Sequence, residues 1–425
     1  MRTRAIALVL ACGCYHPSFE QNVPCSAELT CPGTEVCDTS QAPPRCIDQS
    51  GSGTLPDSGA QLDGAITACG ACANPAPVCA SDGSTCRGCY DDGECSSDVC
   101  VEWTGTCVPE TEALYVKNGG DDSGTCTRAL PCASITRALA LVDATRFTIK
   151  LFDGTYHDAF VTSQPFVLSG ENDGNNARVL FKANGPPHVL EIDGGTALVE
   201  GVILDGGLDE TVRIQGGAAV TMSRVEILDS PASSVYISSS NVDLEQVEVH
   251  DGQGAQGAIA IYGGHLTLER SVIYSVGATC VRASAKYLIE NSFLVGCGGT
   301  GFVAASGATP DSVFQFNTVA GNTFGAVCTV PVTLANTIFA DNGSASPQTG
   351  SLCATSYSLF TDLAPNGTGN LSNSNPGFVA TDDDHITFQS DARDHADPAA
   401  TLTFDFDGEA RPHGAASDIG ADEHY

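Results

Sequence analysis

Short runs of alternating apolar and polar residues recur through the middle of the chain at a nearly constant interval. Each copy has a few alternating apolar positions, a polar or small residue, and a second apolar run that ends in Gly, Asp or Asn. The aligned copies begin at Ala197, Val220, Val242, Leu266, Tyr287, Val313 and Val332. A spacing of about 22 residues is typical of solenoid proteins, in which each repeat packs on its neighbours.

A further short apolar segment lies between successive copies. Examples are VRIQGG from Val212, VYISSS from Val235 and IAIYGG from Ile259. One period therefore holds at least two short strands and two tight corners, and it leaves no room for a helix. Stacked turns of this kind place parallel strands about 4.8 Å apart around a continuous apolar interior. The pattern predicts an all-β fold, a parallel solenoid.

The alignment assigns three columns of positions to the second half of each copy. The corner positions are Arg224, Gln246, Arg270, Asn291, Asn317 and Asn336. The inward positions after the corner are Ile227, Val249, Ile273, Leu294, Ala320 and Phe339. The outward positions are Glu226, Glu248, Val272, Phe293, Val319 and Ile338. Stacked Asn side chains at the corners can hydrogen-bond along their column.

The outward column changes from acidic in the early coils to apolar in the later ones. An apolar stripe on a soluble surface usually has a cover or a partner. Two alternatives follow for the stripe of Val272, Phe293, Val319 and Ile338. Either the long C-terminal segment folds back over it, or it is a docking strip for a glycan or a protein.

These repeats resemble the right-handed parallel β-helix repeats of pectate lyases, pectinesterases and many bacterial surface proteins. The resemblance implies a single-stranded right-handed parallel β-helix over residues 113–425. It implies no single activity, because the same fold occurs in lyases, hydrolases and adhesins.

Both ends of such a solenoid need caps. Ser134 and the amphipathic segment after it predict an N-terminal capping helix. The segment DFDGEARPHGAASDIGADE resembles the closing segment of many bacterial β-helix surface proteins. Its charged residues, predicted to form a salt-bridged cap or to hold a cation, are Asp405, Asp407, Arg411, Asp418 and Glu423. The short DxDG pattern lacks the rest of a calcium loop, so calcium stays unsupported and no cofactor is predicted.

The N-terminal residues MRTRAIALVLACGC have the basic start and short apolar run of an export signal, which is too short to span a membrane. They resemble a bacterial lipoprotein signal, which implies a cysteine that is acylated and becomes the new N-terminus. Cys14 is preferred to Cys12 because 18 cysteines, an even number, then remain for disulfides. The phrase GCYHPSF resembles predicted lipoproteins of myxobacteria, and Tyr15 in place of Asp favours the outer membrane or cell surface.

The remaining cysteines and polar stretches suggest how the chain is divided. The predicted parts are a signal peptide (1–13), a Cys-rich segment (14–48), a flexible linker (49–66), a disulfide module (67–110) and the β-helix (113–425). Disulfides are preferred to zinc in the module, although CxxC spacings occur, because export implies an oxidising compartment. In the β-helix, pairs are predicted between Cys126 and Cys132, Cys280 and Cys297, and Cys328 and Cys353.

Composition limits the choice of partners. The formal net charge is −33, which makes nucleic acid an unsuitable partner because acidic surfaces repel phosphates. The 46 Gly and 20 Cys are typical of a turn-rich, exported protein.

Candidate catalytic chemistry is sparse. A β-helix lyase needs a base and usually a calcium ion held by carboxylates. Arg282 and Lys286 are the only basic pair on one coil, and no carboxylate cluster is predicted beside them. His188, His250 and His265 each stand alone and are interpreted as surface or turn residues.

The sequence therefore favours a surface-anchored lipoprotein whose β-helix serves binding, adhesion or structural display, with a glycan or a protein as ligand. The alternative is a polysaccharide lyase or glycoside hydrolase that acts on acidic glycans. An aromatic or charged groove across several coils would distinguish the two.

Overall fold

The computed structural model describes the backbone of residues 36–38 and 45–47, and residues 72–80, 85–171, 178–183, 185–254, 256–343 and 348–425. The predictions for the signal peptide, for Cys14 and for the linker lie outside these ranges. The chain divides into two compact units, Met1–Ala65 with Phe378–Asp384, and Ile66–Gly377 with His385–Tyr425. In the first unit, β1 (Val36–Asp38) pairs antiparallel with β2 (Arg45–Ile47).

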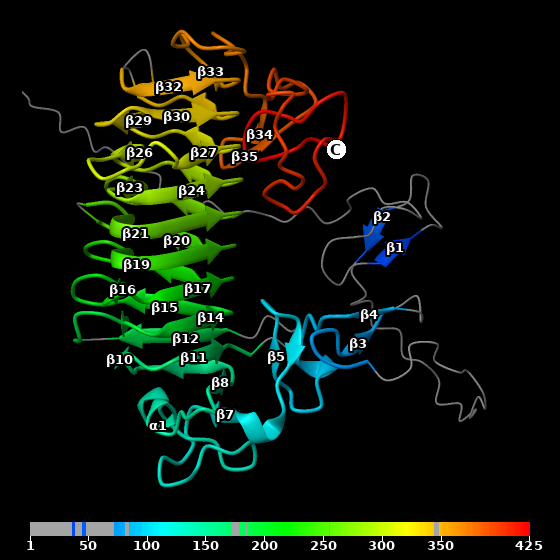
Figure 1. The fold of residues 1–425 in the computed structure, drawn as a ribbon, viewed down its shortest axis with the longest axis vertical. Coiled ribbons are helices and arrows are strands. Elements are labelled where there is room, and N and C mark those ends of the chain that lie inside the picture. The colour runs from blue at the N-terminus through cyan, green and yellow to red at the C-terminus, as the bar shows by residue number, and fades with distance from the viewer. Residues whose placement is uncertain are drawn as a thin grey trace, which may run out of the picture. The chain divides into compact units, whose positions relative to one another are not determined.

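The second unit is a stack of coils whose strands form two large parallel sheets (Figure 1). The 17-stranded sheet contains β7 (Ala113–Val116), β8 (Thr148–Leu151), β10 (Phe160–Thr162), β11 (Phe166–Ser169), β13 (Leu190–Asp193), β14 (Thr196–Glu200), β16 (Val212–Gln215), β17 (Ala219–Ser223), β19 (Val235–Glu245), β21 (Ile259–Glu269), β23 (Val281–Ala283), β24 (Lys286–Glu290), β26 (Thr300–Ala304), β27 (Val313–Gln315), β29 (Phe324–Cys328), β30 (Val332–Ala335) and β32 (Cys353–Ser356). The 10-stranded sheet contains β9 (Gly154–Tyr156), β12 (Val179–Ala183), β15 (Val202–Gly206), β18 (Glu226–Leu228), β20 (Glu248–His250), β22 (Val272–Tyr274), β25 (Phe293–Val295), β28 (Thr318–Ala320), β31 (Ile338–Ala340) and β33 (Leu359–Phe360). The predicted all-β parallel solenoid is confirmed.

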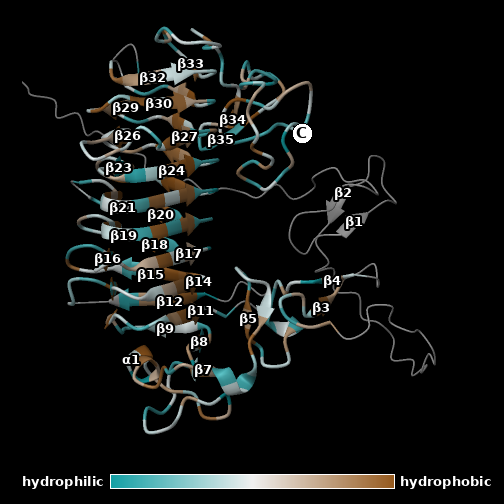
Figure 2. Ribbon diagram, viewed as in Figure 1, coloured by the Kyte–Doolittle hydropathy of each residue, from teal (hydrophilic) through white to brown (hydrophobic). Residues whose placement is uncertain are grey.

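Parallel register places equivalent residues of successive coils in columns, which alternate between the interior and the outer surface. Ile227, Val249 and Ile273 follow one another in register and are fully buried. Hydrophobic and hydrophilic residues accordingly form bands along the strands of the stack (Figure 2). The alternation seen in the sequence therefore builds one continuous apolar core.

The corner between the two sheets uses left-handed backbone. Arg224, Gln246, Arg270, Asn291 and Asn336 all have φ near +50° there. Asn and Gly tolerate this conformation best, whereas other side chains adopt it at a cost that the surrounding stack must offset.

The predicted register is wrong by one residue in a single coil. Phe316, with φ of +51°, occupies the corner in place of Asn317. Asn317 is instead fully buried, where its amide accepts from Ser292 N at 3.0 Å and donates to Ile289 O at 2.9 Å. Asn317 therefore bonds to buried backbone groups, although in the sequence it aligns with the Asn residues at the corners of other coils.

This shift also corrects the two columns that follow the corner. Thr318 takes the outward position beside Phe293, and Val319 takes the inward position beside Leu294. Val319 is fully buried in the core, so it does not belong to an outward stripe. Ala320, assigned inward from the sequence, lies in register with Val295 instead.

The predicted helix at the N-terminal end of the stack is α1 (Ile135–Leu139). Ser134 is its N-cap, and Ile135 and Ala138 are buried. Leu141 and Val142, beyond the helix, also pack on the core.

The disulfide hairpins precede the stack. They comprise β3 (Val78–Cys79), β4 (Cys86–Arg87), the 3-10 turn η1 (Asp92–Glu94), β5 (Cys100–Val101) and β6 (Thr106–Cys107), and the 3-10 turn η2 (Glu110–Glu112) leads into β7. A buried ion pair of 2.6 Å joins Asp92 to Lys150 of β8, and Tyr115 donates to Ser97 O at 2.9 Å. The hairpins are therefore packed on the first coils.

Candidate functional site

The outer face of the 10-stranded sheet divides into two parts of different chemistry. The polar half carries Lys182, Asp205, Glu226, Glu248, His250 and Tyr274, and the same two columns also contain the apolar residues Ile203 and Leu228. The apolar half consists of Phe293, Val295, Thr318, Ala320, Ile338 and Ala340. Val272, which pairs with both Glu248 and Phe293, lies at the boundary.

His250 stands at the centre of the polar half. Its Nε2 lies 3.4 Å from Glu226 Oε1, and its Nδ1 lies 2.9 Å from Asp251 Oδ2. Burial disfavours the imidazolium, but the hydrogen bonds to these two carboxylates outweigh burial and raise the pKa of His250 to about 9. His250 is therefore a cation at neutral pH, which corrects its interpretation as an isolated histidine.

Neighbouring groups complete this network. The ring of Tyr274 stacks on His250 with centroids 5.0 Å apart, and its hydroxyl donates to Glu248 Oε1 at 2.7 Å. Burial and this hydrogen bond to a carboxylate both raise the pKa of Tyr274. Arg178 forms an ion pair with Glu226, whose pKa is lowered chiefly by the hydrogen bond with His250. Three successive strands, β18, β20 and β22, thus present one connected set of charged and aromatic side chains.

A cleft of about 260 Å³ adjoins the polar half. Its charged lining residues are Glu102, Glu171, Arg178, Arg224 and Glu226, and its apolar ones include Val179, Val202 and Ile203. The cleft therefore offers both hydrogen-bonding groups and an apolar surface, the combination by which proteins hold small ligands.

The turn between β5 and β6 forms one wall of this cleft. Glu102 pairs with Arg224 at 2.8 Å, and the backbone N–H groups of Glu102 and Trp103 both donate to the buried Glu200 at 3.2 Å. Trp103, the only tryptophan of the chain, is 43% exposed. The disulfide hairpin therefore places an exposed aromatic ring next to a residue that lines the cleft.

The tail, residues 385–425, covers the apolar half. Phe293 is fully buried, with its ring centroid 4.7 Å from that of Phe406 and 5.1 Å from that of His385. Ala421 N donates to Thr318 Oγ1 at 3.2 Å. Phe293 and Ile338 are completely enclosed, and Val272 is only 4% exposed, so this part of the predicted stripe is not available as a docking strip.

The corner side chains hold the tail in place. Arg270 Nε donates to Phe406 O at 3.1 Å, and Asn291 Nδ2 donates to Phe404 O at 2.7 Å. Asn336 Oδ1 accepts from Asp397 N at 2.8 Å. The expectation that corner Asn residues bond along their own column is therefore wrong for these residues, which bond to the tail.

The two basic candidates, Arg282 and Lys286, lie on different strands of the 17-stranded sheet. Arg282 lies on β23 in register with Ala260, whereas Lys286 begins β24 in register with His265. Lys286 Nζ forms an ion pair of 2.6 Å with Asp311. No carboxylate cluster with metal-ligand geometry lies beside either residue in the described part of the chain.

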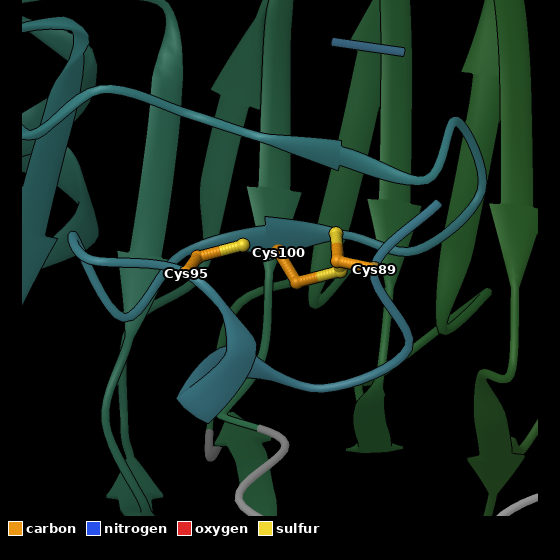
Figure 3. Close-up of side chains that lie close together, drawn as sticks. All are labelled: Cys89, Cys95 and Cys100. Atoms are coloured by element: carbon orange, nitrogen blue, oxygen red, sulfur yellow. A yellow bond between two sulfur atoms is a disulfide. The ribbon is translucent and has the colours of Figure 1, made fainter. Parts of the chain in front are cut away.

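Cysteines of the hairpin region are joined as disulfides. Among the described residues, these bonds include Cys72 to Cys86, Cys89 to Cys100 and Cys95 to Cys107. Figure 3 shows Cys89, Cys95 and Cys100 close together with their sulfurs engaged in disulfides. Because disulfide sulfurs are not thiolates, this cluster does not have the ligands of a zinc site.

The β-helix contains three more disulfides. Cys126 is bonded to Cys132, Cys280 to Cys297 and Cys328 to Cys353. The last pair joins β29 to β32, with Cα atoms 5.3 Å apart.

Comparisons with known proteins agree with this architecture. A family model described as "Right handed beta helix region" matches residues 190–391. No curated protein sequence matches the chain. Among the described residues, no helix has the length and apolar character needed to cross a membrane.

Several solved structures are similar in fold. The pectate lyase Pel9A shares 12% identity, with 74% of this chain and 96% of that chain covered and a TM-score of 0.50. A rhamnogalacturonan lyase shares 14% identity, with coverages of 68% and 87% and a TM-score of 0.37. At 12% identity, the similarity to Pel9A shows the fold alone. The chain therefore has a parallel β-helix fold, and the model of the right-handed β-helix region matches its residues 190–391.

Proposed function

We propose that the protein is an exported lipoprotein, acylated at Cys14 and displayed at the outer membrane, whose polar half binds a neutral extracellular glycan. The export signal and the cysteine that follows it support the anchor. The resemblance of the first residues to myxobacterial lipoproteins supports the same location, the outer membrane.

One observation carries the binding role, namely a connected set of charged and aromatic side chains that crosses three coils beside a cleft. Carboxylates, guanidinium groups and a tyrosine supply both donors and acceptors for sugar hydroxyls. The cleft adds an apolar surface, and Trp103 adds an exposed ring nearby. A net charge of −33 disfavours polyuronates, so a neutral glycan is the better partner.

The protonation states favour binding over catalysis. An imidazolium whose pKa is about 9 is a poor general base at neutral pH. Tyr274 keeps its proton, because its pKa is raised and its hydroxyl donates to Glu248. These residues therefore serve recognition better than proton abstraction.

Trp103 provides a direct test of the glycan site. Its intrinsic fluorescence should change in a saturable way when neutral hexasaccharides, such as cellohexaose or hexa-N-acetylchitohexaose, are added to the purified protein. Glu226→Gln and Tyr274→Phe should each weaken this binding by about fivefold or more, since each removes hydrogen-bonding capacity. Lys286→Ala, on the other sheet, is the matched control and should bind normally.

Two results would contradict the binding role. One is the absence of binding across a broad panel of neutral oligosaccharides. The other is a rise in the absorbance of unsaturated product on a uronate polymer, lost in an Arg282→Ala, Lys286→Ala double variant, which would establish the lyase alternative.

Lipid labelling tests the anchor separately. Cys14→Ser should abolish incorporation of labelled palmitate and release the protein, whereas Cys12→Ser should leave both unchanged. If only the Cys12 variant loses its label, the choice of Cys14 is wrong.

A further inference from the structure

Three side chains with metal-binding groups meet inside the tail. His385 lies on β35 (Asp383–Ile386), Asp407 follows Phe406, and Asp422 lies near the C-terminus. One ligand atom from each lies within 4.8 Å of the others, and His385 Nε2 is 3.1 Å from Asp407 Oδ2. Because they are 15 or more positions apart in the sequence, folding of the tail is what brings them together.

Surrounding contacts fix two of the three ligands. Asp422 is only 6% exposed, and its Oδ2 accepts from Ile386 N at 2.7 Å. The imidazole of His385 packs between Phe293 and Phe406, at centroid distances of 5.1 and 5.8 Å. Supporting contacts of this kind orient metal ligands and hold them in place before the ion arrives. Asp407 is more exposed, at 27% for its side chain, and can adjust to an ion.

The enclosed carboxylate of Asp422 also has few hydrogen-bond partners. In the part of the chain that the structure describes, Ile386 N donates the one hydrogen bond found at the enclosed Asp422 carboxylate. Arg411, the buried arginine of the tail, is engaged by Glu423 at 3.0 Å, with both side chains completely buried. Burying a carboxylate without a full set of partners is costly, and a bound cation removes that cost.

We propose that His385, Asp407 and Asp422 bind one divalent transition-metal ion, for which zinc is the best match. An imidazole nitrogen with two carboxylate oxygens suits zinc, whereas calcium and magnesium prefer oxygen ligands alone. Three protein ligands leave the fourth tetrahedral position to water on the exposed side of Asp407. The ion joins β35 to the last residues of the chain and so locks the tail over the apolar half.

Calorimetric titration of the untagged full chain with zinc chloride, after treatment with a chelator, tests this site. The expected result is one ion per chain, with much weaker binding of calcium. His385→Gln and Asp407→Asn should each weaken zinc binding by about tenfold or more. His395→Gln, an exposed histidine of the same tail, is the matched control and should bind zinc like the unaltered protein.

Folding of each variant is checked by circular dichroism, and Asp407→Asn is the decisive variant because its side chain is partly exposed. Protection of the tail from protease should rise with zinc in the unaltered protein and in His395→Gln only. Absence of zinc binding would overturn the proposal. Binding that survives both ligand substitutions would overturn it as well, by placing the ion elsewhere.

Discussion

The two halves of the outer face of the 10-stranded sheet have the same parallel strand arrangement, but their outward side chains differ in polarity. In the polar half, His250 pairs with Glu226 of the neighbouring coil and with Asp251 of its own coil. In the apolar half, Phe293 and Ile338 occupy the same column as Glu226 and Glu248. The same backbone arrangement therefore carries a polar stretch in the early coils and, in the later coils, an apolar stretch that the tail covers.

The cover itself is built from polar groups as much as from apolar contacts. The tail brings Phe406 onto Phe293, and corner side chains bind its backbone at both Phe404 and Phe406. The buried pair of Arg411 and Glu423 organises the tail from within. An irregular segment can cover a sheet only when its backbone groups are satisfied in this way.

The largest expected effect comes from Phe293→Asp, which gives the apolar half the chemistry of the polar half. Loss of the buried ring and burial of a charge should lower the free energy of unfolding by about 4 kcal/mol or more. The tail should become sensitive to protease while the far-UV circular dichroism of the coils persists. An unchanged tail would show that Phe293 does not hold the cover.

Arg411→Ala should have the next largest effect, because it leaves Glu423 buried without its cation. Breaking a buried ion pair costs about 3 kcal/mol or more. Chemical denaturation measures the loss, and protease cleavage within residues 385–425 should locate it. A loss below about 1 kcal/mol would contradict the role of this pair.

The polar half should respond to pH through His250. Its folded pKa of about 9 lies above the ordinary value of 6.5, so the folded state binds this proton more tightly than the unfolded state. The stabilisation, on the order of 2 kcal/mol, is complete below about pH 6.5 and disappears as the pH rises through about 9. The groups that face His250 are Glu226, Glu248, Asp251 and Tyr274.

Unfolding measured between pH 6 and 10 checks this expectation. His250→Gln should remove the loss of unfolding free energy that His250 causes as the pH rises through about 9, and it should leave the rest of the pH profile unchanged. A profile that is identical in the two proteins would show that His250 is not held as a cation.

Arg178→Ala should have the smallest effect on the free energy of unfolding. Comparing it with Arg411→Ala contrasts an exposed ion pair with a buried one. The Arg178 side chain is 63% exposed, so its ion pair with Glu226 should contribute less than about 1 kcal/mol. Thermal unfolding of the two arginine variants under one set of conditions gives the comparison. Equal losses of stability in the two variants would contradict the distinction between the polar half and the apolar half, which the tail covers.

The repeat pattern was enough to predict the fold, because a period-two alternation within a fixed repeat determines both the strands and the interior. It failed at Phe316 and Asn317, where a buried Asn satisfies Ser292 N and Ile289 O and so imitates the corner residue of other coils. Sequence spacing cannot separate these two uses of Asn.

The candidate site was harder to predict for a physical reason. His250, Glu226 and Tyr274 come from three separate coils, so no local motif links them, although the repeat period places them in neighbouring columns. The turn that carries Glu102 and Trp103 reaches the cleft through contacts with Glu200 and Arg224, about a hundred positions away. Only the folded stack reveals such neighbours.

Hydrogen exchange of the full chain, with and without a neutral hexasaccharide that binds it, tests the central claim most directly. We predict that amides of the tail and of β25, β28 and β31 are well protected without ligand and stay unchanged when it binds. New protection should appear at β18, β20 and β22 and at the turn that carries Trp103. Rapid exchange of the tail in the free protein, or ligand protection at the apolar half in place of the polar half, would contradict the account.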